Sequence, residues 1–294
     1  MNTIIKSRLI AGAMKYGQWG PGFTIQELSN LISETVDIGV HAFDHADIYG
    51  DYEEEERFGR ALKQSGIDRK SIQLITKCGI RLLSDKHPED YIKHYRNSKE
   101  YIISQAEKSL MYLGTDYIDV LLIHRPSPLM NPLEMAEAFV KLKDAGKVLH
   151  FGASNFTTSQ YAMLHSYFPL VTNQVEASLL HLDPFLDGTF DQALELKSPP
   201  TIWSPLAGGR LFNEQDAKAH PLVLSKVQTL AEELGVKIDQ LLLAFLLKHP
   251  AQLIPILGTT KISRLKDAVA ALDIELTDQQ WFELWTSSTG FEVP

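Results

Sequence analysis

The chain has 294 residues, of which 44% are hydrophobic and 22% are charged, and its formal net charge is −9. This composition is typical of a globular protein and excludes a disordered chain, a collagen and a coiled coil. The acidic balance argues against a nucleic-acid partner and against an anionic membrane partner, because both require a basic face on the protein.

The cysteine content and the length of the apolar runs exclude further classes of protein and indicate a cellular location. Cys78 is the only cysteine, which excludes an internal disulfide framework and a cysteine-based zinc site and fits a reducing, cytoplasmic location. Met1–Lys15 has no long apolar core, so we expect no secretory signal. The longest apolar run, Leu241–Leu247, is too short to span a bilayer. No interface stripe stands out, so the sequence predicts no particular oligomeric state.

Short apolar runs alternate with longer helix-like stretches along the chain. The runs are rich in Val, Ile, Leu and Phe with little polar alternation, which is typical of parallel strands buried on both faces. In chain order, we predict strands over Arg8–Ala13, Val40–Asp44, Ser71–Thr76, Tyr117–Ile123, Val148–Ala153, Leu170–Gln174, Thr201–Trp203 and Leu253–Leu257.

Capping signals mark the ends of the intervening helices. Thr24–Glu27 is a capping box that opens a helix ended by Gly39. Asn131 and Pro132 open another, which Gly146 ends. Eight strands alternating with about eight helices predict one α/β domain over residues 1–294, a (β/α)8 TIM barrel. The competing doubly wound sheet would carry a glycine-rich fingerprint after its first strand, and Ala11–Lys15 is not one.

Four reactive side chains follow three successive predicted strands. Asp44 ends the second strand and Tyr49 follows it, Lys77 follows the third strand, and His124 follows the fourth. A barrel brings the carboxyl ends of its strands to one rim, where its active site lies, so we expect these four side chains to meet there.

The four side chains suit proton transfer to a carbonyl oxygen. An unperturbed tyrosine titrates near about 10, and a neighbouring ammonium should lower the pKa of Tyr49. Asp44 would keep Lys77 charged, and a neutral His124 could donate a hydrogen bond to the carbonyl oxygen. The set predicts reduction of a carbonyl, with the hydride supplied from elsewhere.

The segments Phe43–Gly50 and Leu122–Pro126, together with Lys77, resemble the aldo-keto reductase superfamily over nearly the whole chain. More narrowly, Arg125-Pro126, Asp187–Thr189, Gly208–Phe212 and Gly290–Pro294 resemble the YdhF-type bacterial oxidoreductases. The resemblance implies an NADPH-dependent enzyme that reduces small aldehydes or ketones to alcohols. It places Asp44, Tyr49, Lys77 and His124 in the family's four catalytic positions, with Tyr49 as the general acid.

The resemblance also implies which residues hold NADPH or NADP+. Ser154, Asn155 and Gln174 match positions that hydrogen-bond the nicotinamide carboxamide, and Trp203 matches the aromatic residue that stacks on the ring. The loop over the pyrophosphate corresponds to Ser204, Pro205, Leu206, Gly208, Gly209 and Arg210. The segment around the 2′-phosphate corresponds to Gly258, Thr259, Thr260, Lys261 and Arg264.

The 2′-phosphate segment also has a physical rationale. Lys261 and Arg264 would lie at a helix N-terminus, where free N–H groups and the helix dipole favour an anion. Three positions depart from the common pattern, since Gly258 replaces Lys, Ala268 replaces Asn and His45 replaces Thr.

Two other functions remain open. The cluster of His41, Asp44, His45, Asp47 and His124 would suit a metal hydrolase, but strand alternation places His41 and His45 on the face opposite Asp44, so we expect no metal. The other function is a non-catalytic or weakly catalytic nucleotide-sensing interaction subunit, since potassium-channel β subunits keep the same fold.

The sequence says less about the walls of the substrate pocket than about the four catalytic candidates. Tyr16 and Trp19 are candidates for its walls, and Trp281 and Trp285 could line it or pack elsewhere. The polar loop Arg81–Asn97 either borders the substrate opening or lies on the surface.

Overall fold

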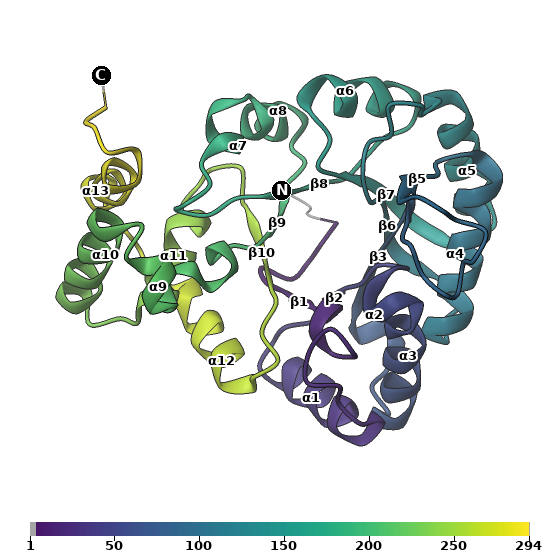
Figure 1. Cartoon of the computed structure of the whole chain (residues 1–294), viewed down its shortest axis with the longest axis horizontal. Coiled ribbons are helices and arrows are strands. Elements are labelled where there is room, and N and C mark those ends of the chain that lie inside the picture. The colour runs from purple at the N-terminus through teal and green to yellow at the C-terminus, as the bar shows by residue number, and fades with distance from the viewer. Residues whose placement is uncertain (1–3, 294) are drawn as a thin grey trace.

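The computed structural model describes residues 4–293 and has a closed barrel of parallel strands at its centre (Figure 1). The expected domain 1–294 also includes Met1–Thr3 and Pro294, which lie outside the described residues. Around the barrel the strands follow the order β1 (Ile10–Gly12), β10 (Ile254–Leu257), β9 (Thr201–Trp203), β8 (Asn173–Glu176), β7 (Val148–Ser154), β6 (Ile118–Ile123), β3 (Gln73–Cys78) and β2 (Ala42–Asp44). The predicted TIM barrel is confirmed, and the doubly wound sheet is wrong. Each of the eight predicted strands has a counterpart, although the sixth, predicted over Leu170–Gln174, lies at Asn173–Glu176.

Helices form a ring outside the strands (Figure 1). They are α1 (Ile25–Asp37), α2 (Tyr49–Tyr52), α3 (Glu54–Ser65), α4 (Lys99–Leu113), α5 (Pro132–Asp144), α6 (Thr158–Tyr167), α7 (Asp183–Leu186), α8 (Thr189–Leu196), α9 (Glu214–Ala217), α10 (Pro221–Leu234), α11 (Ile238–Leu247), α12 (Ile262–Ala270) and α13 (Asp278–Thr289). The predicted capping box is present, with Thr24 and Glu27 each bonding the other's backbone N–H. None of the described helices is long and apolar enough to cross a membrane.

Aliphatic side chains fill the interior of the barrel. Ile10, Ile75, Val120 and Ile256 are among the buried residues of this cluster. Gly152 lets neighbouring strands approach, because a Cβ at this position would lie 2.7 Å from Leu122 Cδ2. The filled interior makes the barrel a rigid support for side chains at its rim.

The segment after β3 forms a small antiparallel hairpin of β4 (Ile80–Arg81) and β5 (His94–Tyr95). The buried Arg81 side chain holds it together through ion pairs of 2.7 Å to Asp90 and 2.8 Å to Glu89. Asn97 Nδ2 donates to the Arg125 carbonyl over 3.3 Å, beside the end of β6. The Arg81–Asn97 segment therefore packs beside the carboxyl rim at the end of β6, with much of its length on the surface.

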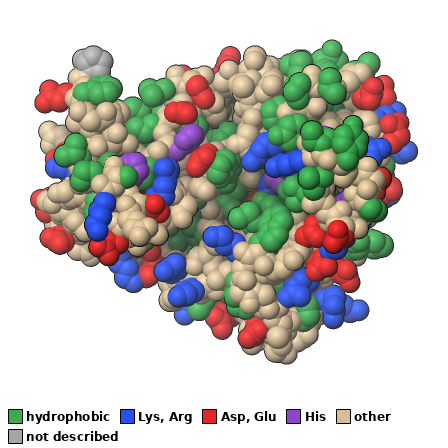
Figure 2. Space-filling view, viewed as in Figure 1, with side chains coloured by type: hydrophobic (Ala, Val, Ile, Leu, Met, Phe, Trp, Pro, Cys, Tyr) green, Lys and Arg blue, Asp and Glu red, His purple; other side chains and the backbone are tan. Residues whose placement is uncertain are grey.

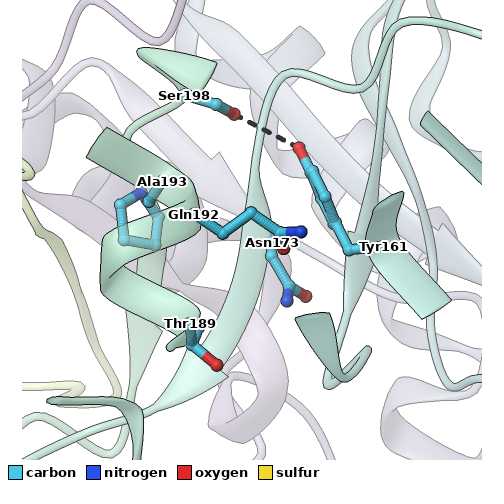
Figure 3. Close-up of a pocket in the computed structure, with 7 residues that line it drawn as sticks. Tyr161, Asn173, Thr189, Gln192, Ala193 and Ser198 are labelled. Atoms are coloured by element: carbon cyan, nitrogen blue, oxygen red, sulfur yellow. Dashed lines mark hydrogen bonds between the residues drawn. The ribbon is translucent and has the colours of Figure 1, made fainter. Parts of the chain in front are cut away.

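Two features away from the rim are structural. Trp281 and Trp285 of α13 stack on each other and contact Phe185, so they pack an aromatic cluster outside the barrel. A small polar cavity lies between α6 and α8, where the Tyr161 hydroxyl lies 3.2 Å from Ser198 Oγ (Figure 3). It has room for about one water molecule and cannot hold a substrate.

Candidate active site

The carboxyl ends of β2, β3 and β6 bring the four predicted side chains together. Asp44 is the last residue of β2, Lys77 lies near the end of β3, and His124 follows β6 directly. Tyr49 opens α2, and the left-handed backbone of Gly50, at φ 56°, turns the chain there. The structure thus gathers at one rim four residues that are up to 80 positions apart in the sequence.

The Lys77 ammonium is the centre of the cluster. Its Nζ donates to Asp44 Oδ2 over 2.7 Å, to the His45 carbonyl over 2.7 Å and to the Tyr49 hydroxyl over 2.9 Å. Three acceptors match the three N–H donors of an ammonium, and the Lys77 side chain is 1% exposed. The ammonium is therefore held in one position.

Burial and charge act in opposite directions on Lys77 and Tyr49. Burial disfavours the Lys77 ammonium, but Asp44 and the Tyr49 hydroxyl outweigh it and raise the pKa of Lys77. Burial raises the pKa of Tyr49, and the opposing effect of Lys77 does not cancel it. The expectation that Lys77 lowers the pKa of Tyr49 overall is wrong for this site, because desolvation of the phenolate dominates. Tyr49 is protonated at neutral pH.

His124 completes the cluster as a neutral imidazole. Its ring centroid lies 6.1 Å from that of Tyr49, with the two rings nearly perpendicular. Burial, followed by the positive charges of Lys77, Arg125 and Lys93, lowers the pKa of His124 well below its usual value. His124 Nδ1 is buried and has no hydrogen-bond partner among the described residues, whereas Nε2 is not enclosed in this way. A neutral ring can present an N–H to a ligand without carrying charge.

Asp44 also connects the cluster to β8. Its second oxygen, Oδ1, accepts a 2.8 Å hydrogen bond from Gln174 Nε2. The resemblance predicts Gln174 near a cofactor, but the sequence does not reveal this contact, which spans 130 residues. A polar residue at the carboxyl end of a predicted barrel strand was the available signal.

The residues expected around a nicotinamide form one network on β7, β8 and β9. Trp203 Nε1 donates to Asn155 Oδ1 over 3.0 Å, and Asn155 Nδ2 donates to Ser154 Oγ over 2.9 Å. Ser154 Oγ in turn donates to the Gln174 carbonyl over 3.1 Å. The structure therefore brings all four predicted residues together beside Asp44.

The expected pyrophosphate loop has an unusual backbone. Ser204, Ala207, Gly208 and Gly209 have φ values between 50° and 89°. Leu206, at φ −105°, directly precedes the left-handed Ala207. A change of backbone hand between neighbouring residues turns successive N–H groups toward one side, which makes an anion-binding concavity. A Cβ on Gly208, Gly209 or Gly258 would meet no atom within 4 Å, so open space adjoins these positions. Pro205 and Leu206 lie within the same loop, and the Arg210 Nε donates to the Ala207 carbonyl over 3.1 Å.

The expected 2′-phosphate segment lies at the start of α12. Thr259, Thr260 and Lys261 precede the helix, and no side chain caps its first N–H groups. Lys261 and Arg264 are exposed, and neither forms an ion pair within the described residues. Uncapped N–H groups beside unpaired cations fit a bound phosphate.

The two aromatic candidates for the pocket wall, Trp19 and Tyr16, differ in burial and in their neighbours. The Trp19 ring lies edge-on to that of Tyr49, with centroids 6.2 Å apart, and the side chain is 41% exposed. Tyr16 is fully buried in the core beside Phe23. Trp19 therefore lies partly exposed beside Tyr49, and Tyr16 is a packing residue.

Two histidines of the metal-hydrolase alternative, His41 and His45, do not face Asp44. His45 is buried against Phe58, with ring centroids 4.2 Å apart, and His41 is exposed. Within residues 4–293, no three His, Cys, Asp or Glu side chains gather as a metal-ligand group. Cys78 is buried and free, as expected for a packing residue.

Three buried acids lie near the site, and the sequence pointed to only one of them, Asp47. Glu55 accepts hydrogen bonds from Thr76 over 2.5 Å and Ser109 over 2.9 Å, and burial raises its pKa to about 7. Burial raises the pKa of Glu54 to about 8, and also raises that of Asp47. Glu54 and Glu55 lie in the acidic run Glu53–Glu56, which is typical of an exposed surface. Their helical spacing from the apolar Phe58, which places them on the same helix face, was the signal that they are buried.

A closed (β/α)8 barrel with a buried Asp–Lys–Tyr–His cluster at its carboxyl rim defines a class of barrel oxidoreductases. The chain belongs to the aldo/keto reductase family, whose family model matches residues 8–286. The expected aldo-keto reductase membership is therefore confirmed.

Two individual relatives and one solved structure are similar to the chain over nearly its whole length. The chain is 44% identical to "Oxidoreductase YdhF" of Escherichia coli over 98% of this chain and 95% of that protein. It is 36% identical to a "6-dehydroglucose reductase" of Agrobacterium fabrum over 98% of each chain. A crystal structure of the thermostable aldo-keto reductase Tm1743, in complex with the inhibitor epalrestat, matches with a TM-score of 0.80 and 24% identity over 95% of this chain and 94% of that one. The last match supports the fold alone.

Proposed function

We propose that the protein is an NADPH-dependent reductase that converts small aldehydes or ketones to alcohols, with Asp44, Tyr49, Lys77 and His124 as its catalytic residues. The observation that carries the proposal is the Lys77 ammonium, which contacts both Asp44 and the Tyr49 hydroxyl. General carbonyl reduction is the chemistry of the aldo/keto reductase family to which the chain belongs.

The proton moves from the Tyr49 hydroxyl to the carbonyl oxygen of the substrate. The raised pKa of Tyr49 keeps this proton available at neutral pH. Once the proton leaves, the Lys77 ammonium at 2.9 Å stabilises the phenolate, and Asp44 holds the ammonium in place. His124, neutral because burial and nearby cations lower its pKa, donates a hydrogen bond that orients and polarises the carbonyl.

A bound nicotinamide would supply the hydride for this reaction. The network of Ser154, Asn155 and Gln174 would bind its carboxamide, and Trp203 would pack against its ring. The left-handed loop around Gly208 and Gly209 would receive the pyrophosphate. Lys261 and Arg264 at the uncapped start of α12 support NADPH over NADH, because only NADPH carries a 2′-phosphate.

The remaining expectations are consistent with this function. The barrel and its surrounding helices extend from Ile10 to Thr289, which supports one domain over residues 1–294. A single buried cysteine and a net charge of −9 support a cytoplasmic enzyme that does not bind nucleic acid. The interaction-subunit alternative is less favoured, because a protein that only senses a nucleotide has no need of the Lys77–Tyr49 pair.

The decisive experiment is NADPH oxidation with a panel of aldehydes and ketones, including neutral sugar aldehydes of the kind that the Agrobacterium relative is named for. NADPH deuterated on the nicotinamide C4 should place deuterium on the carbinol carbon of the alcohol product. Failure to oxidise NADPH with every carbonyl compound, despite tight NADPH binding, would favour the interaction subunit.

A further inference from the structure

Arg125 follows His124 at the end of β6 and is held in a defined position. Its Nη1 donates to the His124 carbonyl over 2.7 Å and to Ser154 Oγ over 3.3 Å. From the other side, Asn97 of the hairpin segment binds the Arg125 carbonyl. The guanidinium thus lies on the rim between β6 and β7, beside the proposed catalytic histidine.

The charge of Arg125 is not balanced by a carboxylate. Two other well-held arginines have acidic partners, Asp119 for Arg69 and Asp90 for Arg81. Arg125 has no ion pair within residues 4–293 although it is half-buried. A partly desolvated cation without a counter-ion costs free energy, which a bound anion would recover.

Most of the hydrogen-bonding capacity of Arg125 is unused. A guanidinium has five N–H donors, and only those of Nη1 find acceptors among the described residues. Nε and Nη2 form no hydrogen bond with the described residues, and neither atom is enclosed by protein, so solvent reaches both. Two such N–H groups in a planar fork match the two oxygens of a carboxylate.

The free charge acts on the reacting groups. The positive charge of Arg125 opposes the burial that raises the pKa of Tyr49, and it adds to the burial that lowers the pKa of His124, so the guanidinium lies within electrostatic range of both. Lys93, exposed on the neighbouring hairpin segment, adds a second positive charge near His124. The rim carries several basic side chains around a central hollow, on a protein whose net charge is −9 (Figure 2).

We propose that Arg125 binds a carboxylate of the substrate, so that the preferred substrates are carbonyl compounds in which a carboxylate is attached to the reacting carbon or lies a few bonds from it. Such compounds include 2-oxo acids, short aldehydic acids and carboxy-substituted aromatic aldehydes. The inference rests on the proposed function, because it assumes that the carbonyl is reduced between Tyr49 and His124. The carboxylate itself is unchanged by the reaction, and Arg125 determines specificity only.

Matched substrate pairs test this assignment. Glyoxylate with acetaldehyde, succinic semialdehyde with butanal, and 2-carboxybenzaldehyde with benzaldehyde differ mainly in one carboxylate. It is bonded directly to the carbonyl carbon in the first pair, lies on a flexible chain in the second and is fixed on a ring in the third. For at least one pair, the wild-type protein should show a kcat/KM about tenfold or more higher for the carboxylate member. Arg125→Met should reduce this preference by about 10- to 100-fold, and Arg125→Lys should retain part of it. Lys93→Met, which removes an exposed charge of the same sign, should change the preference by no more than about threefold.

Binding of a carboxylate that cannot be reduced gives a readout independent of turnover. Titration calorimetry should detect benzoate binding to the NADPH-loaded wild-type protein and a loss of about tenfold or more in affinity in Arg125→Met. Equal benzoate affinities, or equal losses of kcat/KM for both members of every pair, would overturn the inference and leave Arg125 as a support for Ser154. If no carbonyl compound is reduced at all, the proposed function fails; if neutral aldehydes are reduced without any preference for carboxylates, only the inference about Arg125 fails.

Discussion

Lys77 Nζ and the Tyr49 hydroxyl are joined by a 2.9 Å hydrogen bond between two buried side chains. Asp44 holds the same ammonium from the other side at 2.7 Å. The ammonium therefore has both an electrostatic role toward Tyr49 and a structural role toward Asp44, and the two can be separated by mutation.

Lys77→Met should abolish most reductase activity and also destabilise the fold. Removing the ammonium leaves Asp44 as a buried charge without its partner, at a cost of about 3–5 kcal/mol in the free energy of unfolding. The double variant Asp44→Asn/Lys77→Met should recover much of that stability, measured by urea unfolding, but none of the activity. Recovery of activity together with stability would mean that Lys77 has only a structural role.

The rate of carbonyl reduction should be flat from neutral pH to the ordinary tyrosine pKa of 10.0 and fall only above it. Reduction needs a protonated Tyr49, and burial raises the pKa of its hydroxyl. His124 should add no inflection near its ordinary value of 6.5, because burial and nearby cations lower its pKa well below that. Initial rates across this range test both points. An inflection near pH 6.5 that disappears in His124→Asn would show that the imidazole is charged in the working enzyme.

Arg264→Ala should weaken NADPH binding about tenfold while changing NADH binding little, because only NADPH offers Arg264 a phosphate. Fluorescence titration of both nucleotides gives the two dissociation constants. Lys266→Ala is a matched control, since it removes another exposed cation of α12. Equal losses for NADPH and NADH in Arg264→Ala would mean that the phosphate lies elsewhere.

His45 should make the folded protein sensitive to mild acid. Burial, with a smaller effect of Lys77, lowers the pKa of His45 from 6.5 to about 3. Below pH 6.5, His45 binds a proton in the unfolded chain but stays neutral in the folded chain. The contribution of His45 to the free energy of unfolding is therefore complete above pH 6.5 and declines as the pH falls toward 3. His45 alone should contribute a loss of about 2 kcal/mol by about pH 5.

Urea unfolding of His45→Gln at two pH values checks this assignment. The difference in unfolding free energy between pH 7.5 and pH 5 should shrink by about 2 kcal/mol, whatever the variant's stability at either pH. The exposed His41 provides a control, because His41→Gln should leave the difference unchanged. An unchanged difference in His45→Gln would contradict the assignment.

The sequence predicted the barrel because each strand is a short apolar run between capped helices, a pattern that depends on local residues alone. It also predicted that Asp44, Tyr49, Lys77 and His124 meet, since parallel strands of a barrel end at one rim. It did not predict the Gln174–Asp44 bond, which depends on how the barrel closes over 130 residues. The hairpin around Arg81 was equally hidden, because its polar sequence lacks the alternation of a strand pair. The net direction of the Tyr49 pKa depends on burial, which neighbouring residue types do not reveal.

The most direct test of the account is Tyr49→Phe, which removes one hydroxyl and keeps the ring that packs against Trp19 and His124. NADPH oxidation with the best carbonyl substrate should fall by about 10²- to 10⁴-fold, while quenching of the protein fluorescence by NADPH should remain as in the wild-type protein. Turnover within a few-fold of wild type, with NADPH bound normally, would contradict the assignment of Tyr49 as the proton donor.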